Sequence, residues 1–278
     1  MPSLSLSERA QALLWLRSTP SSRWPEGGQQ PQLHLLSDDE SVAQAEQLIL
    51  EWEASGYRFL TLLDDDYPVR LRRASSPPAF LFVRGQLLPK DRIAVAIIGT
   101  RNCTDAGRRR ALKLSRALAE SGITVASGLA LGIDTAAHQG ALAAAGGRTL
   151  AIIGTGLKTI YPPENRDLHE RIAAGGGAVL SQFWPDFKAL KGGANFLARN
   201  RTMADLALAT VVVEASFRSG ARSQAVHAQK SGGTVMLLRS LVEQEEWARD
   251  MSERPGCSIV SDVADVLDRL DLGGLRAP

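Results

Sequence analysis

The chain has 278 residues, of which 44% are apolar and 22% are charged, and its formal net charge is +2. No apolar run approaches the roughly 18 residues of a membrane span, and the first residues lack the basic start and apolar core of a signal peptide. We therefore expect a cytoplasmic protein with no membrane partner. Cys103, Cys257 and the four histidines follow no metal-binding spacing, so no metal and no other cofactor is expected.

The charges are unevenly distributed along the chain. Residues 1–66 carry a net charge of −7 and residues 240–278 carry −5, so the segment between them carries +14. A basic central segment between acidic ends is typical of a protein with a polyanionic partner. A generic solvated surface is the alternative explanation of the same count.

The N-terminal part is predicted to be helical and acidic. Residues 3–18 place their alanines and leucines near one side of a helix, and residues 18–32 are rich in Pro, Gly, Ser and Gln, as in a loop. A second helix is predicted from the capping signal of Ser37 and Glu40. Together these segments predict a small helical module over residues 1–62.

Beyond the module, a connector contains the short strand AFLFVRG, and from residue 93 apolar strands alternate with helices. The six apolar strands are IAVAIIG, ITVASG, TLAIIGTG, AVLSQF, ATVVVEA and TVMLLR, and the tail predicts a short strand and a last amphipathic helix. Such strands form a buried parallel sheet with helices on both faces. We therefore predict an α/β, doubly wound, mostly parallel sheet over residues 63–278.

The turns after the strands carry the chemistry, because ligands bind there in doubly wound sheets. In the first turn Gly99 allows a tight exit, Thr100 and Thr104 offer hydroxyl groups, and Arg101 offers a planar fork suited to phosphate. The following helix carries further arginines, of which we assign Arg109 and Arg116 to a solvated face.

The second turn raises a question, because it combines Ser127, two glycines and an aspartate before a helix. Gly128 and Gly132 let another part of the chain approach closely, and the helix start offers free N–H groups to an anion. For Asp134 we predict a brace or cap that bonds loop amides. His138, with no second metal-type ligand nearby, is predicted to be a hydrogen-bonding partner.

The third and fifth turns are less specific. Gly154 belongs to a Gly-Thr-Gly sequence that lacks the full dinucleotide-binding spacing, and Asn165 is predicted to donate to a phosphate. In the fifth turn Glu214 ends a strand, and Ser219 and Gly220 lead into a helix.

The fourth turn is basic and contains an aromatic residue. Lys188, Lys191, Arg199 and Arg201 converge on one loop and helix start, with Phe196 among them. Single-stranded nucleic acid needs such a set, with charges for the backbone and a ring for a base. A core role for Phe196, with the arginines paired to carboxylates, is the alternative.

The turns contain many donors suited to phosphate and few nucleophiles or bases. No Ser-His-Asp set, carboxylate pair or H-E-x-x-H motif can be assembled from them. This balance indicates binding rather than catalysis, so we do not expect an enzyme.

The ordered motifs GTR, CTDAG, SGLALGIDTAAHQGAL, IGTGLKTIYPPENRDLHERI, NFLARNR and VVVEASFRSG resemble the DprA/Smf DNA-processing family over roughly residues 64–268. The resemblance implies an extended Rossmann-like domain that binds single-stranded DNA, protects it and loads the RecA recombinase, as in DNA uptake and natural transformation. It also implies a homodimer without catalytic activity. Together with the turns, it predicts DNA contacts at Gly99, Thr100, Arg101, Thr104, Ser127, Gly128, Gly132, Asn165, Lys191, Asn195, Phe196, Arg199, Asn200, Arg201, Ser219 and Gly220.

The chain departs from the family pattern at several positions. Thr100 replaces the usual serine, and residues 196–201 read Phe-Leu-Ala-Arg-Asn-Arg in place of Phe-Pro-x-Arg-Asn-Arg. Asp205 places a carboxylate near the basic loop, and residues 219–225 keep little of the usual Ser-Gly-Ser-Leu-x-Thr-Ala. We also expect a member without the C-terminal winged helix that many members carry. A role outside transformation, such as phage defence, therefore stays open.

Two other functions compete with this interpretation. A nucleotide-binding or nucleotide-processing protein similar to the phosphoribohydrolases would share the Rossmann-like fold. That class usually has a Pro-Gly-Gly-x-Gly-Thr phosphate loop near a glutamate, and this chain has Glu214 without the loop. A scaffold whose basic surface binds an acidic protein is the third hypothesis.

Overall fold

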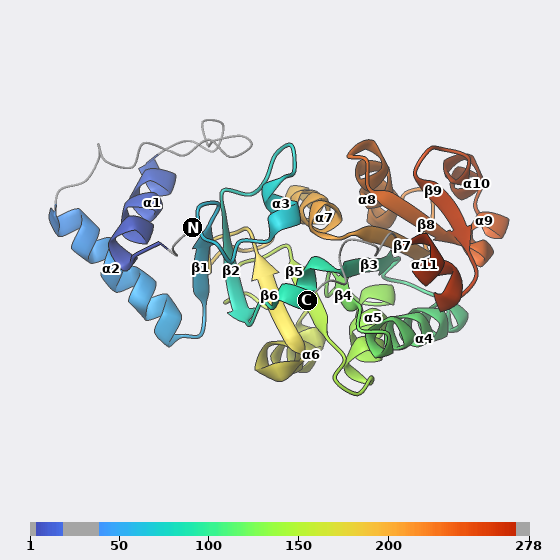
Figure 1. The fold of residues 1–278 in the computed structure, drawn as a ribbon, viewed down its shortest axis with the longest axis horizontal. Coiled ribbons are helices and arrows are strands. Elements are labelled where there is room, and N and C mark those ends of the chain that lie inside the picture. Colours follow the sequence, from blue (N-terminus) through green and yellow to red (C-terminus); the bar gives the residue numbers. More distant parts are fainter. Residues whose placement is uncertain (1–3, 19–38, 271–278) are drawn as a thin grey trace.

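A computed structural model describes residues 4–18 and 39–270 (Figure 1). The predicted loop at residues 18–32 lies almost entirely outside these residues, and so does the predicted cap at Ser37.

The strands form one sheet in the order β1-β2-β6-β5-β4-β3-β7-β8-β9. Their bounds are β1 (Arg58–Thr61), β2 (Phe80–Gly85), β3 (Ala94–Gly99), β4 (Thr124–Ser127), β5 (Thr149–Ile153), β6 (Gly177–Ser181), β7 (Ala209–Glu214), β8 (Thr234–Leu238) and β9 (Cys257–Val260).

The sheet is parallel from β6 to β9, and β2 is antiparallel to both of its neighbours, β1 and β6. The predicted α/β, mostly parallel sheet is therefore confirmed. All six apolar strands formed as predicted, as β3 to β8, and the strands AFLFVRG and the tail segment formed as β2 and β9. Fully apolar strands are stable in this setting because helices cover both sides of them.

The helices connect the strands and cover both faces (Figure 1). Short 3-10 turns occur at Pro89–Arg92 and Pro163–Asn165, and a π-helical turn at Ile172–Gly176. The α-helices are α1 (Leu6–Ser18), α2 (Asp39–Ala54), α3 (Val69–Arg72), α4 (Asp105–Glu120), α5 (Ile133–Leu142), α6 (Arg166–Arg171), α7 (Ala194–Leu206), α8 (Gly220–Lys230), α9 (Arg239–Gln244), α10 (Glu246–Ser252) and α11 (Val263–Arg269).

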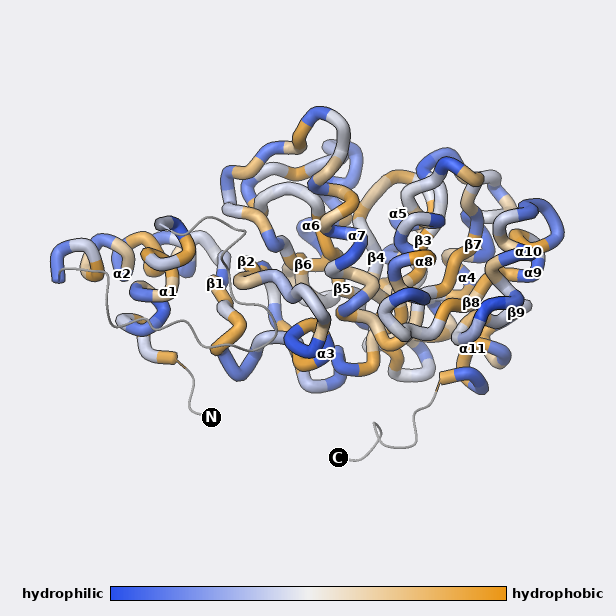
Figure 2. The backbone as a smooth tube through the Cα atoms, turned by 90° about the horizontal axis from the view of Figure 1, so that it is seen from above, coloured by the Kyte–Doolittle hydropathy of each residue, from blue (hydrophilic) through white to orange (hydrophobic). Residues whose placement is uncertain are grey.

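Two layers of apolar side chains lie on opposite faces of the sheet. On one face, α3, α7, α8, α9 and α10 pack on alternate strand residues such as Ala96, Ile98 and Val212. On the other face, α4, α5 and α11 pack on residues such as Val95 and Ile97. This alternation follows from the period of two along a strand. Figure 2 shows hydrophobic residues along the central strands and hydrophilic residues on the outer turns.

The N-terminal helices pack at the β1 end of the molecule, over the aromatic residues of β1 and β2 (Figure 1). Phe59 of β1 lies 5.3 Å from Phe82 between ring centroids, and Trp52 of α2 meets Phe82 edge-on at 4.9 Å. The sequence did not predict β1, which lies inside residues 1–62 but pairs with β2. The boundary at residue 62 stays a prediction, although this strand joins the two parts of the chain.

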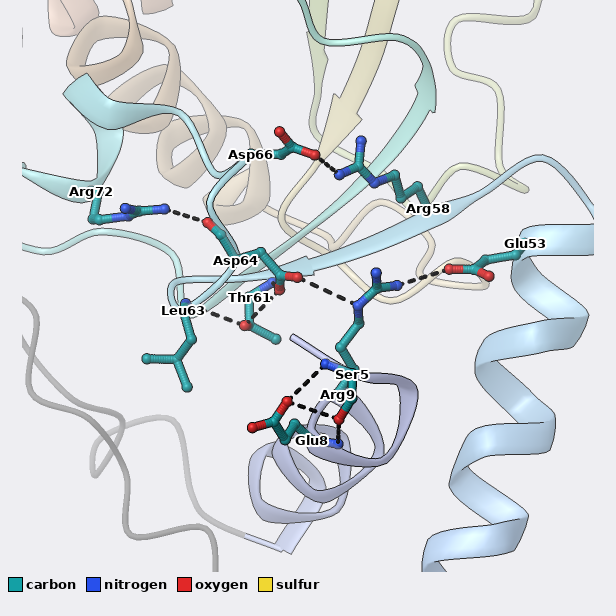
Figure 3. Close-up of polar contacts among 10 residues, drawn as sticks. All are labelled: Ser5, Glu8, Arg9, Glu53, Arg58, Thr61, Leu63, Asp64, Asp66 and Arg72. Carbon is teal, nitrogen blue, oxygen red and sulfur yellow. Dashed lines mark hydrogen bonds and ion pairs between the residues drawn. The ribbon is translucent and has the colours of Figure 1, made fainter. Parts of the chain in front are cut away.

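Polar contacts reinforce that junction (Figure 3). Arg9 of α1 reaches both Glu53 of α2, at 2.9 Å, and Asp64 in the turn after β1, at 3.4 Å. The Asp64 carboxylate also accepts hydrogen bonds from the backbone N–H and the hydroxyl of Thr61, both at 2.8 Å. The buried carboxylate is thereby satisfied by neighbours from both sides of the junction.

Candidate nucleic-acid interface

A pocket of about 370 Å³ lies between the end of β3 and the loop after β7, where the order of strands reverses. Ligands of open α/β sheets bind at this switch point. Side chains from α5, α7 and α8 complete the lining. The pocket is lined by eight of the predicted site residues: Gly99, Thr100, Arg101, Phe196, Arg199, Asn200, Ser219 and Gly220. The fold thus brings together three turns that are far apart in the sequence.

Two other side chains lie near the ring of Phe196, which lines this pocket. The Arg101 guanidinium carbon is 5.3 Å from the ring centroid, and the Tyr161 ring is 5.6 Å away. Gly154 provides the space below, because a Cβ atom there would lie 2.6 Å from the Phe196 ring. Arg101 is exposed, and within residues 4–18 and 39–270 it forms no ion pair. An exposed cation beside an aromatic ring suits a phosphate and a stacked base.

The two glycines of the second turn make room for different parts of the chain. A Cβ atom at Gly128 would lie 2.3 Å from the guanidinium of Arg199, and one at Gly132 would lie 2.3 Å from the carbonyl oxygen of Arg101. Gly132 also has φ of +78°, which favours glycine. The close approach holds the Thr100–Arg101 backbone against α5, and Ile133 N–H donates to the Thr100 carbonyl at 3.3 Å.

Arg199 lies inside the protein, where only 5% of the residue is exposed. It donates to the carbonyl oxygens of Ile152, at 2.7 Å, and Gly128, and to the side-chain oxygen of Asn200 at 2.9 Å. Burial lowers the pKa of the guanidinium, and the nearby Asp134 opposes that effect. Arg199 therefore lines the pocket as a fixed part of its floor. The DNA-phosphate contact that the resemblance implied for Arg199 stays a prediction, and in this structure the N–H groups of Arg199 bond protein oxygens.

Asp134 is the buried counter-ion in this floor. Burial raises the pKa of its carboxyl group, while Arg199 and the backbone N–H groups of Ala130 and Gly128 act in the opposite direction. The carboxylate accepts from Ala130 N–H at 3.4 Å. The predicted role as a brace for loop amides is therefore confirmed.

Three further predicted contact residues are buried and bond protein groups. Ser127 donates to the carbonyl of Ile97 at 2.7 Å. Asn165 donates to the carbonyl of Leu129 at 2.9 Å, and Asn195 donates to that of Gly154 at 2.8 Å. These side chains shape the loops that carry the exposed groups, and the phosphate contact that the sequence suggested for Asn165 stays a prediction.

Thr104 begins α4 and is tied to the end of β7. Its backbone N–H and its hydroxyl donate to the two carboxylate oxygens of Glu214, at 2.9 and 2.7 Å. The same hydroxyl accepts from Gly107 N–H at 3.0 Å and so caps the helix. Both Glu214 oxygens are thereby occupied, and neither Thr104 nor Glu214 lines the 370 Å³ pocket. This pair holds the first turn in place.

The remaining predicted residues divide into two groups. Ser219 caps α8 by accepting from Ala221 N–H at 3.1 Å, and Asn200 donates to the Gly220 carbonyl at 3.4 Å across the pocket. Lys191 and Arg201 are exposed but do not line the pocket. Lys191 lies in the loop before α7, and Arg201 lies farther along that helix.

The sequence analysis missed several lining residues. Arg218 is an exposed cation in the loop after β7, and Gln224 and Met203 come from the facing sides of α8 and α7. Arg218 stands one residue before Ser219, so its place in a strand-end turn was a usable signal. Gln224 and Met203 gave no such signal, because they lie within helices.

Outside the pocket, His138 is fully buried and its Nδ1 lies 2.7 Å from the Thr149 hydroxyl. The predicted role of a hydrogen-bonding partner is confirmed. Within the described part of the chain, no three His, Cys, Asp or Glu side chains are placed to hold a metal ion, and no helix is long and apolar enough to cross a membrane.

Comparison with known proteins identifies the family. The family model of DNA recombination-mediator protein A matches residues 58–271. The chain belongs to the DprA/Smf family. Protein Smf of Synechocystis is 40% identical over 226 residues, which are 80% of this chain and 54% of that protein. DprA of Streptococcus pneumoniae is 37% identical over 203 residues, 72% of this chain and 69% of that protein. The chain thus spans about half to two thirds of these DprA/Smf relatives.

Solved DprA structures share the architecture. The crystal structure of Streptococcus pneumoniae DprA aligns with a TM-score of 0.69 and 28% identity, covering 96% of this chain and 94% of that one. Helicobacter pylori DprA aligns with a TM-score of 0.67 and 29% identity, covering 77% of this chain and 95% of that one. The latter structure describes a single-stranded DNA binding mode of that protein. The Rossmann-like DprA fold is therefore shared by this chain.

Proposed function

We propose that this DprA/Smf protein binds single-stranded DNA along the rim where the parallel strands end. The observation that carries the proposal is the pocket at the switch point, edged by the exposed cations Arg101 and Arg218 and by the ring of Phe196. Cations neutralise phosphates, and an aromatic ring stacks a base of any identity. The relative from Helicobacter pylori, described by its single-stranded DNA binding mode, supports the same function.

We further propose that the protein is a cytoplasmic recombination mediator rather than an enzyme. In this role it protects a single strand and loads a RecA-type recombinase, as in DNA uptake and natural transformation, and it acts as a homodimer. Membership of the family supports these steps. The nucleotide-processing alternative, which needs a glutamate near the bound nucleotide, gains no support. Both carboxylate oxygens of Glu214 accept hydrogen bonds from Thr104, and neither residue lines the pocket. Co-precipitation with RecA and light scattering test the partner and the dimer.

A titration of fluorescent single strands with matched variants tests the DNA-binding step. Arg101→Gln and Arg109→Gln each remove one exposed cation, but only Arg101 lines the pocket. We expect Arg101→Gln to weaken binding of a 15-nucleotide oligothymidine by about tenfold, since a charge-assisted hydrogen bond to phosphate contributes roughly 1.5 kcal/mol. Arg109→Gln should weaken it less than twofold. Binding of the parent should fall as salt rises, and a duplex of the same length should bind more weakly.

Equal losses for the two variants would show that only the overall charge matters. No binding of any oligonucleotide at low salt would reject the proposed function and favour an acidic protein partner. Arg199 is unsuitable for such a test, because its buried guanidinium holds the loops together.

A further inference from the structure

Gln224 is an unexplained polar residue on the buried side of α8. Its neighbours on that side are Ala221, Ala225 and Ala228, which pack against the sheet. Only 2% of Gln224 is exposed, and its side-chain Nε2 has no hydrogen-bond partner among the described residues. A buried amide without a partner lowers the stability of the folded state, so natural proteins rarely keep one without a reason.

The position of Gln224 supplies a reason. The residue lines the 370 Å³ pocket at the switch point, together with Met203 of α7 and Ile98 at the end of β3. A volume within the range of about 300–1,000 Å³ is typical of small-molecule sites. Gln224, whose amide nitrogen is buried and unpartnered, therefore borders a space with the volume that a nucleobase needs.

We propose that Gln224 reads the edge of one adenine that inserts between α7 and α8. A glutamine amide presents one donor and one acceptor side by side, and this pair matches the N6 amino group and ring nitrogen of adenine. Inserting the base would give the Nε2 its missing partner. The inference rests on the proposed function, because the adenine belongs to a strand whose phosphates face Arg101 at the edge of the pocket.

The consequence is a base preference on an otherwise sequence-neutral surface. Charge and stacking alone bind any strand. One bidentate amide–base pair adds discrimination of roughly 1–3 kcal/mol, which corresponds to about 5- to 150-fold in affinity. We therefore expect the parent protein to bind a thymidine 15-mer in which every third residue is deoxyadenosine at least fivefold more tightly than it binds oligothymidine.

The test compares Gln224→Met with Gln229→Met on the two strands. Methionine keeps the length of the side chain and removes the unpartnered amide, so we expect the Gln224→Met protein to fold with unchanged or higher thermal stability. It should lose the adenine preference and bind the two strands with equal affinity. Gln229 lies on the same helix but outside the pocket, where its amide donates to the Pro255 carbonyl at 3.4 Å. Gln229→Met should keep the preference.

The possible outcomes distinguish a failure of this inference from a failure of the proposed function. If the parent binds neither strand, the proposed function fails. If it binds both strands equally, or if Gln224→Met keeps the adenine preference, only the inference fails. Calorimetry with free dAMP distinguishes the source of the base. Binding of dAMP that depends on Gln224, together with equal affinity for the two strands, would assign a mononucleotide pocket and reject strand reading.

Discussion

Arg101 and Arg199 show how position decides the role of one residue type. Both arginines follow motifs that predict phosphate contacts, yet Arg101 is exposed beside Phe196 and Arg199 is buried against Gly128. The difference arises because Gly128 has no side chain and leaves a cavity that the guanidinium fills. Arg199 then fixes the loops by its hydrogen bonds to backbone carbonyl groups, while Arg101 remains available to a ligand. Sequence spacing alone does not separate these roles.

The buried ring of His138 predicts a pH dependence of stability. The Thr149 hydroxyl donates to the Val125 carbonyl at 2.7 Å, so it accepts a hydrogen bond from Nδ1–H of His138. Burial, and to a lesser degree Arg199, lower the pKa of His138 from 6.5 to about 3. Above pH 6.5 both folded and unfolded chains carry the neutral ring. Below it only the unfolded chain binds the proton, so stability is lost as pH falls towards 3.

His138→Gln removes this titration and keeps a donor for Thr149. We expect the parent to lose about 2 kcal/mol more unfolding free energy than the variant between pH 7 and pH 5, because each pH unit below 6.5 costs about 1.4 kcal/mol. Urea unfolding over a pH series measures the difference, in which the common carboxylate titrations cancel. A difference between the two proteins that stays constant with pH would contradict the assignment.

At the scale of elements, the strand-to-helix turns are the functional units, and their glycines set the geometry. Gly99 is the last residue of β3 and lies where the register between β3 and β7 shifts. A Cβ atom at Gly99 would lie 2.5 Å from the side chain of Ile133. Gly132, in the turn after β4, approaches the Thr100–Arg101 backbone of the turn after β3 just as closely. Two turns from separate strands are thereby held together, which places the Arg101 backbone at the rim. The sequence showed glycine-rich turns, but their partners became visible only in the fold.

Gly132→Ala should therefore disturb both stability and binding. Its Cβ atom would lie 2.3 Å from the Arg101 carbonyl, and its φ of +78° is unfavourable for alanine. We expect a loss of more than about 2 kcal/mol in unfolding free energy, together with weaker single-strand binding. Gly146→Ala is the matched control, because Gly146 has φ of +64° but no atom within 4 Å of the added Cβ. Equal losses in the two variants would show that the close approach is unimportant.

At the scale of the molecule, the acidic N-terminal part and the sheet share one hydrophobic core. The rings of Phe59, Phe80 and Phe82 form one cluster with Trp52 and Trp184, which come from both sides of residue 62. Strand β1 adds backbone hydrogen bonds to β2. The +14 charge of residues 67–239 coincides with the part that contains the pocket, while the N-terminal helices lie at the β1 end (Figure 1).

This shared core predicts that the chain unfolds in one transition. Cutting at the sequence-based boundary, residue 62, removes β1 and uncovers the aromatic cluster. We expect residues 63–278 alone to be less stable than the whole chain by at least about 3 kcal/mol, the cost of deleting one buried phenylalanine. Calorimetry of the whole chain should show a single peak. Two separate peaks, or a shortened chain of equal stability, would support an independent N-terminal module.

The sequence by itself determined the parallel sheet, its six central strands and the glycine-rich turns that follow them, because apolar runs and glycine placement are local properties. It did not determine β1, whose short apolar run is stable only through pairing with β2. Nor did it separate exposed Arg101 from buried Arg199, or show the unpartnered amide of Gln224. Burial and hydrogen-bond partners depend on residues distant in the chain, so only the tertiary structure decided them.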